Sequence, residues 1–342
     1  MSSPPESLPG RTTRLVFSAI GAAEGAVWWW VHPFGVETPG AHTLPFCVLF
    51  FATSAALVAR FTWDGAALAR WAALSLGLGA LVALVTLQVW SELPAAAAPY
   101  EGDGGRIFAW ALGSFVFLYV TVPFAQIFQQ SGRLRFRYPP LFGHSWGNFF
   151  IGLVAVLFVQ AVWALLGLWA QLFELLGVPH FEDLFTSRPF AYLATFTLFG
   201  FGLAVGRDSE RVIQALRTTT GMIARALLPL VVLIALLFLA TLSLTGLRPL
   251  WETGTATPVV LALLGALAVL LNGVLEDGQQ APGYPKPLLR ALDAAVLAMP
   301  AYAAIAWYGT GLRVSQHGLT PDRRRSACAT DASRPTRSTS PR

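Results

Sequence analysis

Hydrophobic residues dominate this chain in long runs separated by short polar segments. Nine runs approach or reach the roughly 20 residues that a helix needs to cross about 30 Å of hydrocarbon. They cover residues 12–31, 43–60, 71–90, 107–128, 149–170, 189–206, 226–246, 258–275 and 291–311. Because lipid offers backbone N–H and C=O groups no partners, each segment inside a membrane must satisfy its own hydrogen bonds, as a helix does. The pattern predicts an all-α fold, a polytopic transmembrane helical bundle of about nine spans.

Composition agrees with this prediction. Of the 342 residues, 55% are hydrophobic and only 12% are charged, which is more apolar surface than a single soluble core can hide. The first hydrophobic run is long enough to stay in the membrane as an anchor, so we expect no cleaved signal peptide. Residues 1–323 are expected to form one integral membrane domain that contacts the lipid bilayer.

The arginines predict the orientation of the spans. With the N-terminus in the cytoplasm, thirteen Arg and Lys residues before the C-terminal tail fall in inner segments and three in outer loops, as the positive-inside rule requires. The net charge of +5 is spread over short loops, so we expect no nucleic-acid partner. One lysine against 22 arginines is typical of a GC-rich bacterial genome, which places the protein in a bacterial inner membrane.

The inner connection at residues 131–146 alternates arginines with apolar side chains. Its arginines are Arg133, Arg135 and Arg137, followed by a Pro139–Pro140 pair. Such a ribbon can lay guanidinium groups against anionic lipid head groups. The alternative is ordinary topogenic charge on an irregular loop.

Two further inner connections have their own character. Residues 207–225 begin with acidic side chains and carry apolar residues on one face, which predicts a short amphipathic surface helix that turns into the next span near Gly221. Residues 276–290 are rich in Pro and Gly and predict an irregular turn.

Ionisable side chains inside spans are costly, by about 2.5–3.5 kcal/mol on insertion scales, so each is a candidate functional group. Glu24 lies near the middle of the first span, between Gly21 and Gly25, whose GxxxG spacing lets a neighbouring helix approach closely. Glu24 is a candidate proton-exchanging or substrate-facing carboxyl; alternatively, it is protonated or hydrogen-bonded within the helix packing. Asp293 is the second candidate, although an ion pair with Arg290 at the inner interface also explains it.

Motifs of soluble enzymes are missing from the chain. It has no Walker loop, HExxH or CxxC sequence, so we expect no catalytic residues, metal ion or cofactor. Three consecutive tryptophans, 28–30, end the first span and are interpreted as an interfacial anchor.

The segment "WYGTGLRVSQHGLTPDR", residues 307–323, carries the one distinctive motif. It resembles the helix end and following segment of a family of bacterial multi-pass membrane proteins called domain of unknown function 4153. The matching positions include Arg313, Gln316, Gly318, Leu319, Thr320, Pro321 and Arg323, while His317 stands where the family has an aromatic residue. The resemblance implies an integral membrane protein and brings no cofactor or catalytic residue. The residues themselves predict a turn after the last helix, in which Arg313 and Arg323 are candidates to bind an anionic lipid or substrate group.

Residues 324–342 contain no Leu, Ile, Val or aromatic residue. A segment of this composition cannot bury enough apolar surface to become ordered. We therefore expect a disordered tail that arises from a shifted reading frame or a truncation.

Three classes of function fit these features. The first is a permease-like or transport-related protein with Glu24 as its working carboxyl. The second is a non-catalytic scaffold or accessory subunit of an envelope complex, which uses small-residue faces to bind other membrane proteins. The third is a membrane enzyme for lipid-linked substrates, at which only residues 131–146 hint.

Overall fold

The computed structural model describes residues 10–32, 43–91, 103–176, 180–246, 256–275 and 283–317. Within these residues the regular elements are helices, with no strand, so the predicted all-α class is confirmed. The chain divides into two compact units, Met1–Thr218 and Thr219–Arg342. The prediction of one integral membrane domain over residues 1–323 stays a prediction, and the two units are described separately below.

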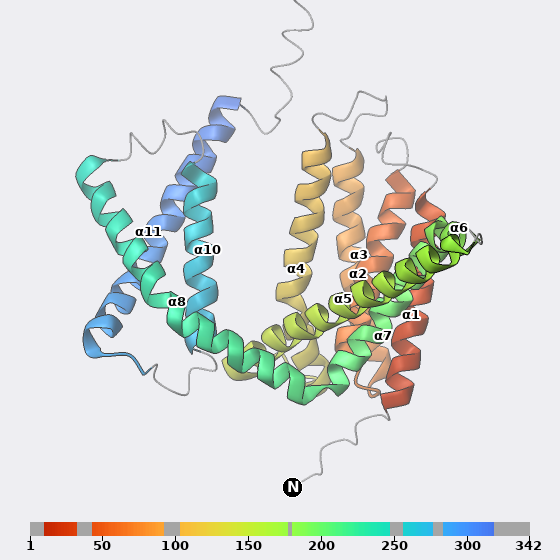
Figure 1. Ribbon diagram of the computed structural model, residues 1–342. Helices are drawn as coiled ribbons and strands as arrows, with labels where there is room; N and C mark the ends of the chain where they lie inside the picture. Colours follow the sequence, from red (N-terminus) through yellow and green to blue (C-terminus); the bar gives the residue numbers. More distant parts are fainter. Residues whose placement is uncertain are drawn as a thin grey trace, which may run out of the picture. The chain divides into compact units, whose positions relative to one another are not determined.

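The first helices of unit 1 run alternately up and down in chain order, and a later, longer one crosses them obliquely (Figure 1). Its helices are α1 (Gly10–Val31), α2 (Thr43–Thr62), α3 (Leu68–Ser91), α4 (Asp103–Ser131), α5 (Tyr138–Leu175), α6 (His180–Thr186), α7 (Arg188–Asp208) and the start of α8 (Glu210–Thr245). Unit 2 holds the rest of α8 with α10 (Ala256–Leu275) and α11 (Lys286–His317). Each predicted span overlaps one long helix; the short α6 was not predicted.

Seven helices are long and apolar enough to cross a membrane, counted over the described residues. They are α2, α3, α4, α5, α7, α8 and α11. The apolar stretch counted in α10 is shorter, Val259–Leu275. In α1, Arg11, Arg14 and Glu24 lower the mean hydropathy. The chain is therefore a multi-pass membrane protein, and the predicted number of nine spans is approximate.

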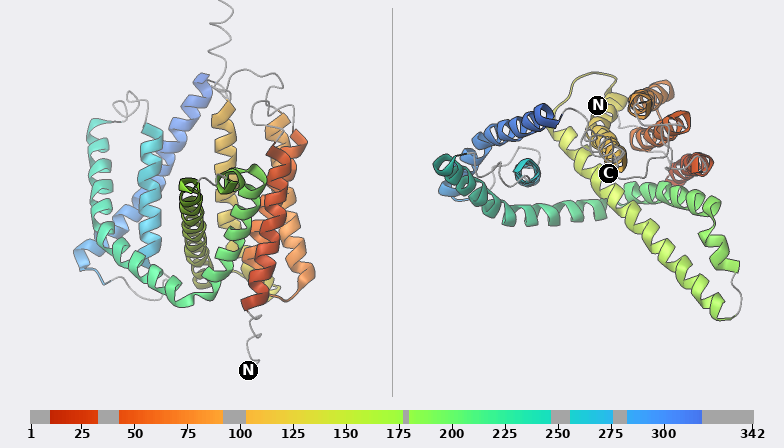
Figure 2. Two further views of the ribbon diagram at one scale, coloured as in Figure 1. Left: turned by 45° about the vertical axis from the view of Figure 1, so that its right-hand side comes forward. Right: turned by 90° about the horizontal axis from the view of Figure 1, so that it is seen from above.

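Helix α5 corrects the prediction of an irregular loop over residues 131–146. Only residues 132–137 are non-helical, and Pro139 and Pro140 lie in the first turn of α5. Proline is favoured there because the first backbone N–H groups of a helix have no intrahelical partner to lose. At 38 residues and 1.5 Å per residue, α5 is about 57 Å long. It runs obliquely to α2, α3 and α4 (Figure 2), as a helix longer than the hydrocarbon thickness must.

Glycines let α1 and α7 pack with their backbones nearly in contact. A Cβ atom added at Gly21 would overlap the carbonyl of Phe196, and one at Gly25 would lie 2.7 Å from the Tyr192 carbonyl oxygen. On the facing helix, a Cβ atom at Gly200 would overlap the carbonyl of Phe17. The close approach predicted from the GxxxG spacing is confirmed, and its partner is α7.

The predicted surface helix at residues 207–225 is not a separate element. Residues 210–245 form one helix, α8, with Pro229 inside it. Near the C-terminus, residues 283–285 are non-helical and α11 begins at Lys286, in agreement with the predicted turn. However, α11 continues to His317, beyond the predicted end of the span at residue 311.

Unit 2 has its own hydrophobic core between α8, α10 and α11. Leu228 and Ala235 of α8, Leu267 of α10, and Ala295 and Tyr302 of α11 are fully buried. The phenolic hydroxyl of Tyr302 donates a hydrogen bond to the backbone carbonyl of Ala235. This bond satisfies the polar end of a large side chain inside an apolar core.

Candidate functional site

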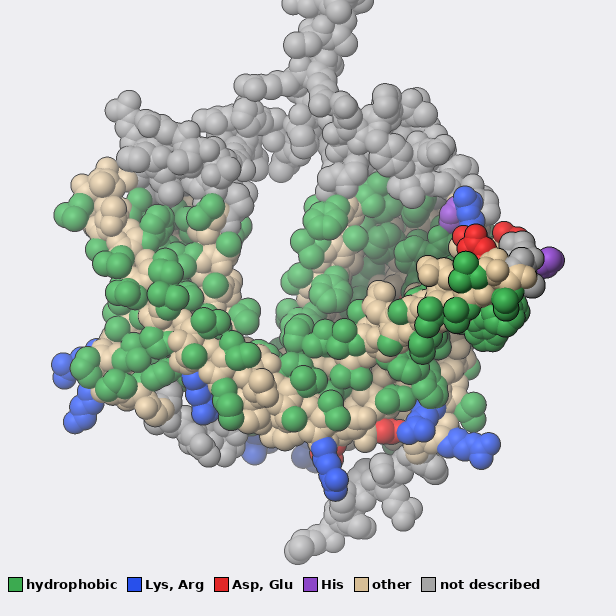
Figure 3. Space-filling view, viewed as in Figure 1, with side chains coloured by type: hydrophobic (Ala, Val, Ile, Leu, Met, Phe, Trp, Pro, Cys, Tyr) green, Lys and Arg blue, Asp and Glu red, His purple; other side chains and the backbone are tan. Residues whose placement is uncertain are grey.

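The arginines of unit 1 gather at one end of its helices, where α1 and α5 begin and α2, α4 and α7 end (Figure 3). Two polar contacts tie this end together: Arg14 forms a 2.8 Å ion pair with Asp208, and Gln129 donates to Asp64 at 2.9 Å. The opposite end carries Arg188, whose Nη1 lies 3.1 Å from His32 Nδ1. Unit 1 is therefore polarised in charge, as the predicted topology requires.

Glu24 is buried inside unit 1 in an ion pair. Nη2 of Arg60, on α2, donates to Oε2 of Glu24 at 2.6 Å, and the exposed fractions of the two side chains are 1% and 4%. The Arg60 guanidinium also lies over the ring of Phe199 on α7, 5.9 Å from the centroid. Three helices therefore enclose the pair. The sequence predicted a role for Glu24. Arg60 was counted only among the positive charges at the inner ends of spans, and its contact with Glu24 was not predicted.

Thr53 of α2 connects the carboxylate to the aromatic residues at the end of α1. Its hydroxyl hydrogen-bonds to Glu24, and its oxygen accepts a 3.1 Å hydrogen bond from the indole N–H of Trp28. Trp28 also stacks on Tyr192 and Phe196 of α7. It is therefore part of the packing between helices, whereas Trp29 and Trp30 are about half exposed, at 49% and 50%, as the interpretation of an interfacial anchor requires.

The ion pair leaves one donor unused. The Nε–H of Arg60 is buried and has no hydrogen-bond partner among the described residues. An unpaired buried donor costs about 1–3 kcal/mol, and burying the charges themselves costs more. The Glu24–Arg60 pair therefore lowers the stability of the bundle relative to apolar residues, and a functional role would explain its presence.

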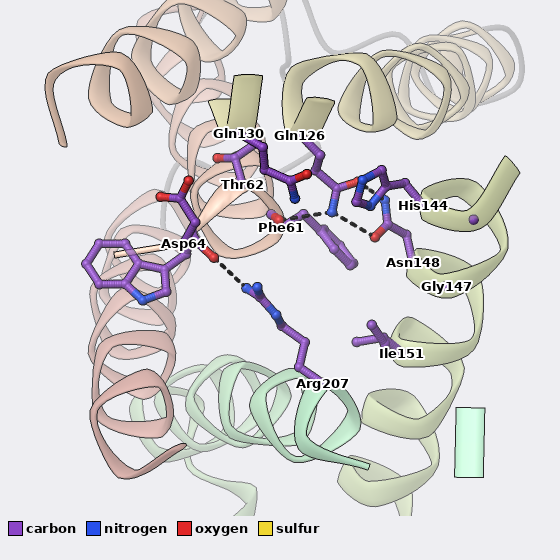
Figure 4. Close-up of a pocket in the computed structure, with 12 residues that line it drawn as sticks. Phe61, Thr62, Asp64, Gln126, Gln130, His144, Gly147, Asn148, Ile151 and Arg207 are labelled. Carbon is purple, nitrogen blue, oxygen red and sulfur yellow. Dashed lines mark hydrogen bonds between the residues drawn. The ribbon is translucent and has the colours of Figure 1, made fainter. Parts of the chain in front are cut away.

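A polar pocket of about 160 Å³ lies at the arginine-rich end of unit 1 (Figure 4). Four parts of the chain line it. They are Phe61, Thr62, Trp63 and Asp64 at and after the end of α2; Gln126 and Gln130 of α4; Gly143, His144, Gly147, Asn148 and Ile151 of α5; and Arg207 of α7. The pocket thus has room for a small polar guest among polar side chains.

An amide pair forms one wall of the pocket. Gln126 Nε2 donates to Asn148 Oδ1 at 3.1 Å, and Asn148 Nδ2 donates back to Gln126 Oε1 at 2.8 Å. Gln126 Nε2 also donates to the carbonyl of Phe61 at 3.0 Å. Both side chains are buried, so these bonds join α2, α4 and α5 where lipid supplies no alternative partner.

Arg207 connects the pocket to the ion pair. Its Nη1 donates to the carbonyl of Trp63 at 2.8 Å and to the carbonyl of Arg60 at 3.2 Å, and its guanidinium lies over the ring of Phe17, 5.7 Å from the centroid. In Figure 4, Arg207 projects toward the pocket from the helix opposite Gln126 and Asn148. The residue that holds Glu24 is therefore itself held by a residue of the pocket.

The other candidates from the sequence lie away from this site. Asp293 is exposed within the protein, and no ion pair joins it to Arg290 among the described residues, so its role stays a prediction. Arg133, Arg135 and Arg137 are exposed between α4 and α5. Arg313 and Gln316 belong to the last turns of α11 and not to a turn after it. Gly318, Leu319, Thr320, Pro321, Arg323 and the tail 324–342 lie outside the described residues.

Compared with protein-family models, with curated proteins and with solved structures, the chain matches none of them. The resemblance of residues 307–323 to the domain of unknown function 4153 family stays a prediction. The buried ion pair and the polar pocket of unit 1 are therefore the basis of the proposed function.

Proposed function

We propose that the chain is a permease-like membrane protein, in which unit 1 moves a small polar solute or a proton past Glu24. The observation that carries the proposal is the buried 2.6 Å ion pair between Glu24 and Arg60, whose arginine directly precedes residues of a polar pocket in the chain. Phe61 and Thr62 of the pocket follow Arg60 in the chain. A solute in the pocket would therefore contact residues that directly follow Arg60, the counterion of the buried carboxylate, in the chain.

Energetics support a functional role for the pair. Replacing a buried ion pair by apolar residues of similar volume is often neutral or stabilising, so packing alone does not explain why two charges occupy this position. Ionisable groups inside membrane spans typically belong to ion pathways and proton relays. Glu24 is suited to such a role because it is a buried carboxyl inside the helix packing, with the Arg60 guanidinium 2.6 Å away.

The scaffold alternative receives less support from the same helices. It depends on small-residue faces that are free to bind another membrane protein. The Gly21 and Gly25 face of α1 is already occupied, because it packs against the backbone of α7. We therefore favour transport over a purely structural role.

Proton flux in proteoliposomes tests the proposal. The purified protein is reconstituted in vesicles loaded with a pH-sensitive dye, and a potassium diffusion potential drives protons inward. We expect flux above that of empty vesicles for the wild type and a loss of at least tenfold for Glu24→Gln, which keeps the shape of the side chain but cannot release a proton. Flux in Glu24→Gln equal to that of the wild type would overturn the proposal.

Asp293→Asn provides the matched control. It makes the same carboxyl-to-amide change at an exposed position of α11, so its flux is expected to equal that of the wild type. A variant pair in which both proteins lose flux equally would point to a general effect of charge on reconstitution and would count against Glu24.

The location and family belong to the same proposal. A bacterial inner membrane and a cytoplasmic N-terminus are supported by the arginine-rich end of unit 1. Membership of the domain of unknown function 4153 family is supported by the motif at residues 307–323.

A further inference from the structure

We propose that the turn between α4 and α5 is a binding site for anionic phospholipids, which it holds by their phosphate groups. This site is separate from the pocket and from Glu24 and does not depend on the transport proposal. It consists of the non-helical residues 132–137, together with one arginine from the start of α3.

Four guanidinium groups surround this short turn. Arg133, Arg135 and Arg137 are all exposed. Arg70 joins them from α3: its Nη1 donates to the carbonyl of Phe128 at 3.2 Å, and its guanidinium contacts Gly132. The positive φ of Gly132, 64°, is a conformation that glycine adopts without strain, and it lets the chain turn back beside Arg70.

No acidic side chain of the described residues forms an ion pair with these arginines. The ion pairs in the described residues are Arg14–Asp208 and Arg60–Glu24, and neither includes an arginine of the turn. Guanidinium groups bind phosphate through paired N–H donors. A group of four such side chains at the membrane end of a bundle therefore matches the phosphates of anionic lipids.

Apolar side chains between the arginines favour a lipid over a soluble phosphate. Leu134 is 76% exposed and Phe136 is 40% exposed. The ring of Phe136 packs edge-on against Phe124 of α4, with 5.1 Å between centroids. Phe124 precedes the end of α4 at Ser131 by seven residues, which is about 10 Å along the helix axis. The turn therefore folds back along the apolar surface of the span, where acyl chains lie.

Lipid retention measured on the full-length protein tests this site. The protein is purified in a mild detergent, titrated with phosphatidylglycerol or phosphatidylcholine, and analysed by native mass spectrometry. We expect the wild type to retain phosphatidylglycerol in preference to phosphatidylcholine. The combined variant Arg133→Gln, Arg135→Gln and Arg137→Gln is expected to lose phosphatidylglycerol affinity by about fivefold for each arginine removed.

A second triple variant controls for net charge. Arg11→Gln, Arg211→Gln and Arg290→Gln remove three exposed positive charges elsewhere and are expected to retain phosphatidylglycerol as the wild type does. Equal losses in both triple variants, or no loss in the first, would overturn the site. The Arg→Lys version of the first triple keeps the charge and provides a folded comparison if the glutamine version unfolds; a several-fold loss of phosphatidylglycerol affinity supports recognition by guanidinium groups, and unchanged affinity overturns it.

Two further measurements separate a lipid from free phosphate. Phe136→Ala is expected to weaken retention of phosphatidylglycerol several-fold without changing the effect of inorganic phosphate. Competition by millimolar inorganic phosphate that removes the lipid completely would show that the turn binds phosphate alone, and would overturn the assignment to a lipid.

Discussion

Arg60 of α2 and Glu24 of α1 form a buried ion pair in which Nη2 and Oε2 are 2.6 Å apart. The two residues are separated by 36 positions in the chain and lie on adjacent helices. Glu24 faces the packed interior of unit 1, where α7 also contributes through Phe199. The burial of both charges predicts how substitution of either residue changes the free energy of unfolding.

Breaking this pair from one side is expected to destabilise the protein strongly. Glu24→Ala leaves Arg60 buried without a counterion, which costs about 3–5 kcal/mol. Replacing both residues, as Glu24→Met with Arg60→Met, removes both charges and is expected to restore most of that loss. Unfolding in mixed detergent micelles measures both variants. A double variant less stable than Glu24→Ala would contradict this account of the pair, whatever the outcome for flux.

The glycine contact between α1 and α7 predicts a second effect. Gly21→Ala places a methyl group against the Phe196 carbonyl, so the helices must separate, and we expect a loss of about 1–3 kcal/mol in unfolding free energy. Gly113→Ala on α4 is the control, because a Cβ atom there meets nothing within 4 Å, and the higher helix propensity of alanine makes it neutral or slightly stabilising. Equal effects at the two positions would indicate that the close approach is not needed.

The amide pair at the pocket predicts coupling between α4 and α5. Gln126→Leu leaves the Asn148 amide without its partner, and Asn148→Leu does the same to Gln126. A double-mutant cycle should give a coupling energy of about 0.5–1.5 kcal/mol. A coupling energy near zero would show that the two amides find other partners once separated.

Topology gives a fourth prediction. With nine spans and a cytoplasmic N-terminus, a tag at the C-terminus is expected to be accessible from outside the cell and a tag at the N-terminus only after permeabilisation. Accessibility of both tags from the same side would mean that one of the nine helices does not cross; α1 and α10 are the first candidates, because neither is among the seven helices that are long and apolar enough.

Helix positions were predictable because hydrophobic run length is a direct consequence of membrane thickness. The nine runs overlap the nine long helices. Helix ends were less predictable. Residues 138–146, expected in an inner connection, form the start of α5 with Pro139 and Pro140 in its first turn. The long α8 joins a polar segment to a span without a break.

The sequence predicted the buried carboxyl of the site but not the residues around it. Glu24 stands out in an apolar run, and its glycines predict a close neighbour, but the identity of that neighbour depends on pairing between distant segments. Arg60 and Arg207 look like topogenic charges because both come at the end of an apolar run. Their inward orientation is a result of tertiary packing. The polarity of Gln126 inside a span was the remaining available signal, and its reciprocal partner Asn148 lies at the very edge of the next predicted span.

Residue 60 is bound from two directions, with its side chain on the carboxylate of α1 and its carbonyl oxygen on the guanidinium of α7. A guest in the pocket that accepted the Arg207 hydrogen bonds would therefore remove one of the two contacts that hold the counterion of Glu24 in place.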